Sequence, residues 1–175
     1  MVIGLGNDIS TCRVLTYMAT LEQLAAGGQL IRHEPDFEQW EMPSRFILYP
    51  PEFPGWYEGD FKNAPRVRGR NLSPYEQAEQ ILYEFMLGRP MAYDVDYKKL
   101  GPLGQHVWEL KTPDVRIFGW FARRRYFVAV RGELKDKIPN AKLYGPYIES
   151  VVNFRTALDL DLPKAVTEIA KDAIL

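Results

Sequence analysis

The stretch HVWELKTPDVRIFGWFARRRYFVAVRG, residues 106–132, decides the fold of this 175-residue chain. It contains three runs rich in β-branched and aromatic residues, divided by two short turns that carry Pro, Asp and Arg. Such runs predict β-strands, and short turns between them predict antiparallel pairing. The expected strands cover 106–111, 115–121 and 126–131. The sequence therefore predicts a small twisted antiparallel sheet, a meander of three to four strands, in an α+β fold with helices on one face.

Side chains alternate between the two faces of a strand, so each expected strand can be divided by parity. One face is wholly apolar and predicts packing against a helix. The opposite face mixes charged and aromatic residues, namely Glu109, Lys111, Arg116 and Arg131 with Phe118, Trp120 and Phe127. Parity does not fix the register between strands, so the neighbours on this mixed face are left open.

Three interpretations of the mixed face compete. Basic groups contact phosphates and aromatic rings stack on unpaired bases, so the face has the composition of a nucleic-acid surface. It could instead be a second buried layer, beneath the proline-rich arm or a helix at 147–158, with Glu109 paired to a basic neighbour. The meander could also accept a partner strand or helix. Composition alone favours the buried layer.

The helix expected at 74–87 has the clearest boundaries in the sequence. Ser73 is placed to cap it, Pro74 takes the first helical position, and Glu76 completes a capping box. Gly88 then ends the apolar pattern. Apolar spacing predicts three further helices, at 10–26, 147–158 and 163–173.

The segment from 29 to 70 is rich in proline and aromatic residues. Its aromatic content predicts an ordered arm that packs on the protein, with a strand at 45–49. We therefore expect two parts: residues 1–70 as an N-terminal helix and arm, and residues 71–175 as an α/β domain with C-terminal helices.

Composition excludes several classes of protein. The hydrophobic content of 46% and charged content of 26% are typical of a folded globular chain. No run of about 18 apolar residues could cross a bilayer, and the N-terminus has no secretory signal pattern. The single Cys12 can form no intrachain disulfide, which favours a reducing compartment and predicts a cytoplasmic protein. Neither a metal nor a cofactor is expected.

The formal net charge of −1 hides an uneven distribution. Residues 1–97 carry eight Lys or Arg and fourteen Asp or Glu, whereas residues 98–155 carry twelve and five. The second segment therefore has a charge of +7. Such a basic module attracts an anionic partner, although acidic flanks within the chain could also neutralise it.

The order of short motifs from 71 to 137 resembles the RelE/HigB superfamily of ribosome-dependent mRNA interferase toxins, particularly its phage-derived branch. A helix is followed by a Lys-Leu-Gly segment, a strand with Trp-Glu-Leu-Lys, a strand that begins near an Arg, and a strand followed by two lysines. The residues that carry the resemblance are Lys99–Gly101, Trp108–Lys111, Arg116–Phe118 and Gly132–Lys137. The similarity covers less than half of the chain.

The resemblance implies a twisted sheet whose concave basic face grips mRNA on the ribosome. Cleavage would proceed by attack of the 2′-hydroxyl on the adjacent phosphate, which requires a base, cationic groups and an acid, but no metal. The implied catalytic residues are Lys111, Arg116, Lys135, Lys137 and Tyr144. The implied nucleic-acid-binding residues are Arg123, Arg124, Arg125, Arg131 and Trp120. The implied partners are the ribosome with its mRNA and a small antitoxin.

The chain departs from the family pattern in three ways. Lys111 stands where Arg is usual, and a lysine cannot reproduce the bidentate grip of a guanidinium. Asp136 lies between the two lysines and weakens their local field. The acidic, aromatic segment 1–70 is an unusual addition. We therefore keep an alternative from another class: a non-catalytic phage accessory protein that uses this scaffold to bind a host or virion protein.

Overall fold

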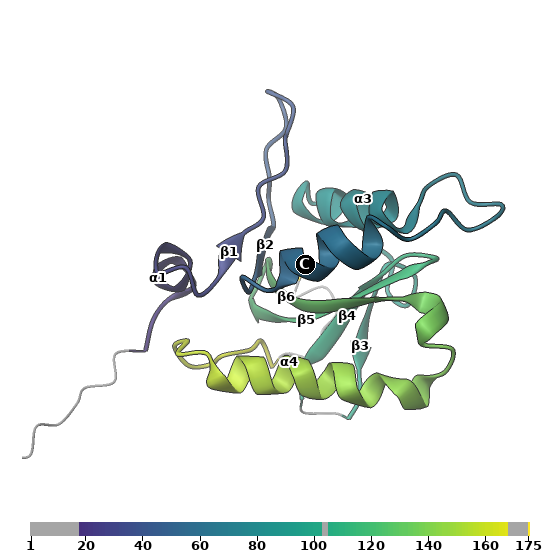
Figure 1. Cartoon of the computed structure of the whole chain (residues 1–175). Helices are drawn as coiled ribbons and strands as arrows, with labels where there is room; N and C mark the ends of the chain where they lie inside the picture. The colour runs from purple at the N-terminus through teal and green to yellow at the C-terminus, as the bar shows by residue number, and fades with distance from the viewer. Residues whose placement is uncertain (1–17, 103–104, 168–174) are drawn as a thin grey trace, which may run out of the picture.

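The computed structural model describes residues 18–102, 105–167 and 175. It is an α+β structure built on one open sheet of six strands in the order β1-β2-β6-β5-β4-β3 (Figure 1). The expected antiparallel meander is confirmed and has four strands. These are β3 (Tyr97–Leu100), β4 (Val107–Lys111), β5 (Val115–Arg123) and β6 (Tyr126–Leu134).

Two strands from the N-terminal arm extend this meander. The expected strand near 45–49 forms as β2 (Phe46–Tyr49) and pairs in parallel with β6, so the sheet is mixed. The short β1 (Ile31–Arg32), which the sequence did not predict, pairs antiparallel with β2 at the edge. Residues 33–45 between these strands project from the body of the molecule (Figure 1).

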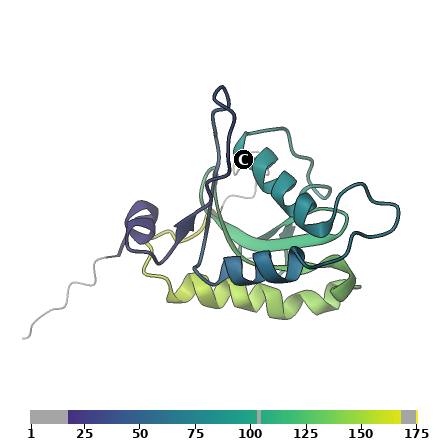
Figure 2. The same cartoon turned by 45° about the horizontal axis from the view of Figure 1, so that its top comes forward.

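Helices cover both faces of the sheet, so the expectation of helices on one face is wrong (Figure 2). One face packs against α3 (Pro74–Met86) together with α2 (Phe53–Trp56) and η1 (Tyr57–Phe61). The other face packs against α4 (Gly145–Ala157), with α1 (Leu21–Ala26) beside it. The reason is the large aromatic side chains of β5 on that second face, which a helix must cover to remove them from water.

Helix α3 begins and ends as its sequence predicts. The Ser73 hydroxyl accepts a hydrogen bond from the Glu76 backbone N–H, and the Glu76 carboxylate accepts one from the Ser73 N–H at 2.7 Å. This reciprocal capping box satisfies two N–H groups that would otherwise lack partners. The helix then buries an apolar stripe centred on Ala78, Leu82 and Phe85 against the sheet.

The other expected helices differ from the structure in extent. Within the described residues, the first helix starts at Leu21 because Thr20 and Gln23 form a capping box there; residues 10–17 lie outside the described part. The helix expected at 147–158 forms as α4. Of the segment expected to be helical at 163–173, residues 163–167 are not helical, and the remainder lies outside the described residues.

A β-bulge in β6 changes which face of the sheet its side chains point to. Arg131 pairs with Phe118, but Gly119 pairs with Ala129, so Val130 is an extra residue in β6. Parity therefore fails across Val130. Phe127 was expected on the mixed face with Arg131; it instead packs on the α3 face, and Val128 takes the opposite side.

The arm is part of the same core as the meander. Phe53, Tyr57 and Phe61 are all buried on the α3 face of the sheet. Trp56 lies so close to β6 that a Cβ on Gly132 would stand 1.8 Å from its ring. The division of the chain at residue 70 stays a prediction.

Two short 3₁₀ helices, η2 (Lys135–Lys137) and η3 (Ala141–Tyr144), lead from β6 into α4. Within the described residues, no helix has the length and apolar character needed to span a bilayer.

Candidate functional site

The five expected catalytic residues lie toward one end of the sheet. Strand β4 ends at Lys111, β5 begins at Val115 and β6 ends at Leu134, and these ends adjoin because the strands are antiparallel. Lys111 is directly opposite Arg116, and Arg116 is directly opposite Glu133 on its other side. Lys135 and Lys137 follow in η2, and Tyr144 ends η3. Residues dispersed over 34 positions of sequence are therefore gathered into one region.

The centre of this region is an ion pair between Glu109 and Arg116. The Arg116 Nε lies 3.5 Å from the Glu109 Oε2, close enough for charge attraction but without a hydrogen bond between these two atoms. Glu109 is 2% exposed, and the Arg116 side chain is 11% exposed. The guanidinium also donates from Nη1 to the carbonyls of Thr112 and Val115, which fixes its orientation.

The electrostatics of this pair depend on burial. Removal from water raises the pKa of Glu109 above its usual value, and the positive charge of Arg116 and a hydrogen bond with Tyr144 partly oppose that rise. Burial also raises the pKa of Tyr144, and the nearby Glu109 carboxylate adds to the effect. Glu109 can therefore exchange a proton at a higher pH than an ordinary glutamate, while Tyr144 keeps its proton at neutral pH.

Glu109 and Tyr144 line an open cleft of about 700 Å³. Lys98 and Lys135 contribute positive charge to its wall, and Lys98 is directly opposite Glu109 in the β3–β4 pairing. Gly145, the first residue of the 13-residue α4, lines the same cleft. Lys99 lines the cleft as well, and a helix N-terminus carries partial positive charge, so the cleft combines three ammonium groups with a helix end. This is an environment for an anion next to a buried carboxyl group.

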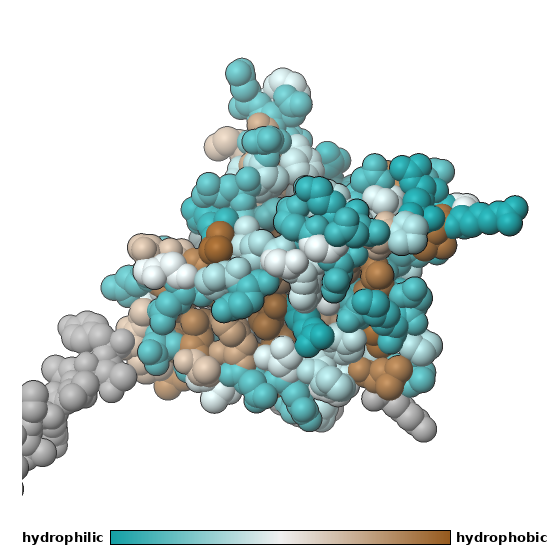
Figure 3. Space-filling model, viewed as in Figure 1, coloured by the Kyte–Doolittle hydropathy of each residue, from teal (hydrophilic) through white to brown (hydrophobic). Residues whose placement is uncertain are grey.

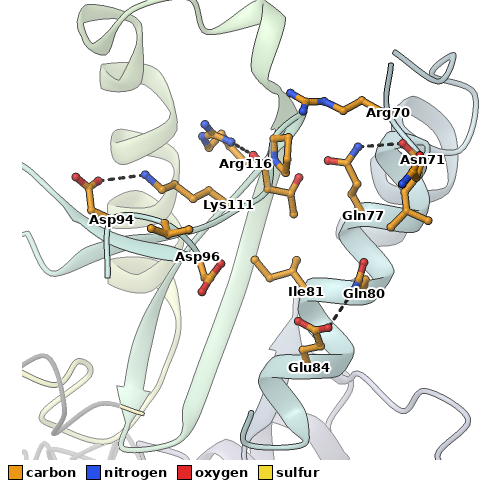
Figure 4. A pocket seen from close by; sticks show the side chains of 14 residues that line it. Arg70, Asn71, Gln77, Gln80, Ile81, Glu84, Asp94, Asp96, Lys111 and Arg116 are labelled. Carbon is orange, nitrogen blue, oxygen red and sulfur yellow. Dashed lines mark hydrogen bonds and ion pairs between the residues drawn. The ribbon is translucent and has the colours of Figure 1, made fainter. Parts of the chain in front are cut away.

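Lys111 lines a second pocket of about 640 Å³, between the sheet end and α3 (Figure 4). Its Nζ extends toward Asp94 Oδ1 at 3.1 Å, and Lys98 reaches the same oxygen at 2.9 Å. Hydrogen bonds from the two lysines hold the pKa of Asp94 below its usual value. Arg116 borders this pocket as well, so the ion pair separates the two openings.

The two lysines of η2 make different contacts. Lys135 donates from Nζ to the Ile138 carbonyl at 2.7 Å, which leaves its positive charge without a carboxylate partner in the described residues. Lys137 pairs with Glu133 at 3.1 Å. Because a hydrogen bond and the charge of Glu133 raise the pKa of Lys137, that lysine is unsuited to act as a base.

The residues expected to bind nucleic acid are not brought to this region. Arg123 is the last residue of β5, and Arg124 and Arg125 form the turn to β6, at the opposite end of both strands. Arg123 is paired there with Glu22 and lies over the Tyr126 ring. Trp120 is fully buried beneath α4 and donates from its indole nitrogen to the Lys164 carbonyl at 2.8 Å, so it offers no face for base stacking.

Arg131 has an intermediate position. It is exposed on the α4 side, with its guanidinium 5.2 Å from the centre of the Tyr147 ring. Phe118 and Trp120 thus form a buried layer beneath the helix at 147–158, and Glu109 is paired with Arg116, whereas Phe127 packs on the α3 face and Arg131 is exposed. That interpretation, left open by the sequence, is the one the structure bears out for Phe118 and Trp120.

Two residues of the site were missed by sequence reasoning. The sequence predicts only a structural pairing for Glu109, and it does not indicate Lys98 because no strand is predicted over residues 97–100. Parity placed Glu109 on the face of Arg116, which was the available signal. Its burial at a cleft wall depends on η3 and α4, and no local pattern reports that arrangement.

No group of three or more His, Cys, Asp or Glu in the described residues is arranged to hold a metal ion. Comparisons with known proteins give no further constraint, because no family model, no curated protein and no solved structure matches this chain.

Proposed function

We propose that this protein is a RelE/HigB-like endoribonuclease of phage origin that cleaves mRNA on the ribosome and is held in check by a small antitoxin. The observation that carries the proposal is the buried Glu109, 3.5 Å from Arg116, in the wall of a cleft lined by Lys98, Lys135 and Tyr144. These side chains provide a base, cations and an acid, the three requirements of 2′-hydroxyl attack on a phosphodiester.

In this mechanism the ionised Glu109 carboxylate takes the proton from the 2′-hydroxyl. The oxygen then attacks the adjacent phosphorus, and the bond to the 5′-oxygen breaks. Lys98, Lys135 and the N-terminus of α4 stabilise the negative charge of the phosphorane, while Tyr144 donates a proton to the departing 5′-oxygen. The products are a 2′,3′-cyclic phosphate and a 5′-hydroxyl. Arg116 keeps the Glu109 carboxylate oriented and favours its ionised form.

A second candidate is a non-catalytic accessory protein that binds a host or virion protein. It is favoured by the ion pairs that already engage Lys111 and Lys137, and by the burial of Trp120, since all three were expected to face RNA. The ion pair of Lys98 with Asp94 favours it too, because that lysine is one of the cations of the proposed mechanism. The two candidates differ in whether the cleft residues control any activity.

The test is inducible expression in a bacterium, with growth and mRNA cleavage in a translating extract as readouts. We expect growth arrest and cleavage from the wild type, and neither from an Arg116→Ala, Lys135→Ala variant. A control variant, Arg66→Ala with Arg68→Ala, removes the same charge from exposed positions in the loop before α3 and should remain active. Growth arrest that persists in the Arg116→Ala, Lys135→Ala variant would support a binding inhibitor. Absence of any phenotype from the wild type would support the accessory role.

A further inference from the structure

A third pocket, of about 540 Å³, has a composition opposite to that of the cleft. It lies between the base of the projecting segment 33–45, here called the projecting arm, the α2–η1 segment and α3. Its walls carry aromatic rings and four acidic side chains, and no Lys or Arg lines it. The acidic residues are Glu34, Asp36, Glu58 and Glu79.

The aromatic walls form a continuous cluster. Tyr49 stacks on Phe53 with ring centres 5.1 Å apart, Phe53 adjoins Tyr57 at 5.7 Å, and Tyr57 adjoins Tyr75 at 5.3 Å. Aromatic faces attract ammonium and guanidinium groups, most strongly when the cation leaves water. Lys62 already illustrates this attraction, because its Nζ lies 5.7 Å from the centre of the Tyr75 ring.

The acidic residues supply the complementary charge. Glu58 is paired with Lys62, but no described Lys or Arg lies within ion-pair distance of Glu34, Asp36 or Glu79. Glu79 accepts a hydrogen bond from the Tyr57 hydroxyl, which fixes its carboxylate. A carboxylate has about four acceptor positions, so this bond leaves capacity for a donor from a ligand.

The projecting arm, residues 33–45, also carries exposed apolar side chains near this pocket in sequence. Tyr83 lines the pocket, packs against Phe37 at 5.3 Å between ring centres, and donates its hydroxyl to Glu41. Trp40 and Met42, the neighbours of Glu41 in sequence, are 77% and 81% exposed. In Figure 3 the projecting arm is otherwise mainly hydrophilic. Exposed Trp and Met a few residues along the chain from the pocket residue Asp36 are suited to a polypeptide ligand, because residues that flank the bound side chain can reach them.

We propose that this acidic aromatic pocket binds an arginine or lysine side chain of a protein partner, with Trp40 and Met42 contacting the residues beside it. The site is separate from the cleft at Glu109 and does not depend on ribonuclease activity. It assigns the two oppositely charged regions of the chain to two different ligands, an anion at the sheet end and a basic polypeptide at the arm.

The test is titration of the full chain, with labelled tyrosine rings followed by NMR, using acetylated Ala-Ala-Arg-Ala-Ala and Ala-Ala-Lys-Ala-Ala amides. We expect saturable shifts with both peptides and none with the matched norleucine peptide. Asp36→Asn with Glu79→Gln should weaken binding at least about tenfold, since each removes a charge-assisted contact. Asp36→Asn alone, at an exposed position of the arm, should weaken it measurably without disturbing the Tyr57 hydrogen bond.

Two controls make the result decisive. Glu149→Gln with Asp161→Asn changes the net charge equally at exposed sites elsewhere and should leave affinity unchanged. Trp40→Ala should weaken the binding of the peptides but not the binding of free butylguanidine. Equal binding of the norleucine peptide, equal weakening by the control pair, or absence of saturable shifts would overturn the site. If Trp40→Ala leaves the affinity for the peptides unchanged, the assignment of a polypeptide ligand is overturned.

Discussion

Arg116 is the cation nearest to the buried Glu109 carboxylate, with 3.5 Å between Nε and Oε2, and the two residues lie on adjacent strands beneath α4. Removal of one member of a buried ion pair leaves the other charge without compensation. Arg116→Met should therefore lower the free energy of unfolding by about 3–5 kcal/mol at pH 7. Glu109→Met with Arg116→Met should recover most of that loss, because neither charge then remains.

The same variant has a predicted pH dependence. Burial raises the pKa of Glu109 in the folded protein above its pKa in the unfolded chain. Protonation of Glu109 therefore stabilises the folded protein. This stabilisation is complete at pH values below the unfolded pKa and is lost as the pH rises through the folded pKa. Arg116→Met should raise that pKa further. Denaturant unfolding at pH 5 and pH 7 should thus show a smaller loss at pH 5; equal losses would contradict the assigned environment of Glu109.

Tyr144 is the proposed proton donor to the leaving oxygen. Tyr144→Phe should lower the cleavage rate by about 10²-fold or more, the usual contribution of a positioned acid. A substrate with a 5′-thio leaving group needs no such proton, and with it the variant should approach the wild-type rate. If the variant is equally impaired on both substrates, Tyr144 acts through structure and not as an acid.

Gly132 permits the close approach of the Trp56 ring to β6. Gly132→Ala should lower the free energy of unfolding by about 2 kcal/mol or more, because backbone or indole must move to relieve the overlap. Gly55→Ala, in the same helix as Trp56 and with no atom within 4 Å of the new Cβ, is the matched control and should be neutral or slightly stabilising. Similar stabilities for the two variants in urea would show that α2 is not packed on β6 as described.

Local sequence signals account for much of the fold. Ser73 and Glu76 fix the start of α3 because a capping box requires only residues three positions apart. The strands β4, β5 and β6 follow from their composition and turns. Tyr57 and Phe61 follow Phe53 at helical spacing, a signal for α2 and η1 that the surrounding prolines obscured.

Other features depend on contacts that are distant in sequence. The parallel pairing of β2 with β6 joins segments about 80 residues apart, and no local pattern specifies it. The bulge at Val130 reverses the facing of Phe127, which strict alternation cannot anticipate. The basic residues Lys111, Arg116 and Lys135 all lie near one end of the sheet, but Lys111 and Lys135 line different pockets. The role proposed for Glu109 required knowing that Tyr144 of η3 packs beside it.

The central claim is that Glu109 serves as the base for cleavage of RNA in the cleft. The most direct measurement maps the ends of mRNA fragments in a translating extract with wild-type protein and with Glu109→Gln, across a range of pH. We predict 2′,3′-cyclic phosphate and 5′-hydroxyl ends from the wild type, a rate that rises with pH through the raised pKa of Glu109, and loss of both in the variant. Equal cleavage by Glu109→Gln, or no cleavage by the wild type at any pH, would contradict the claim.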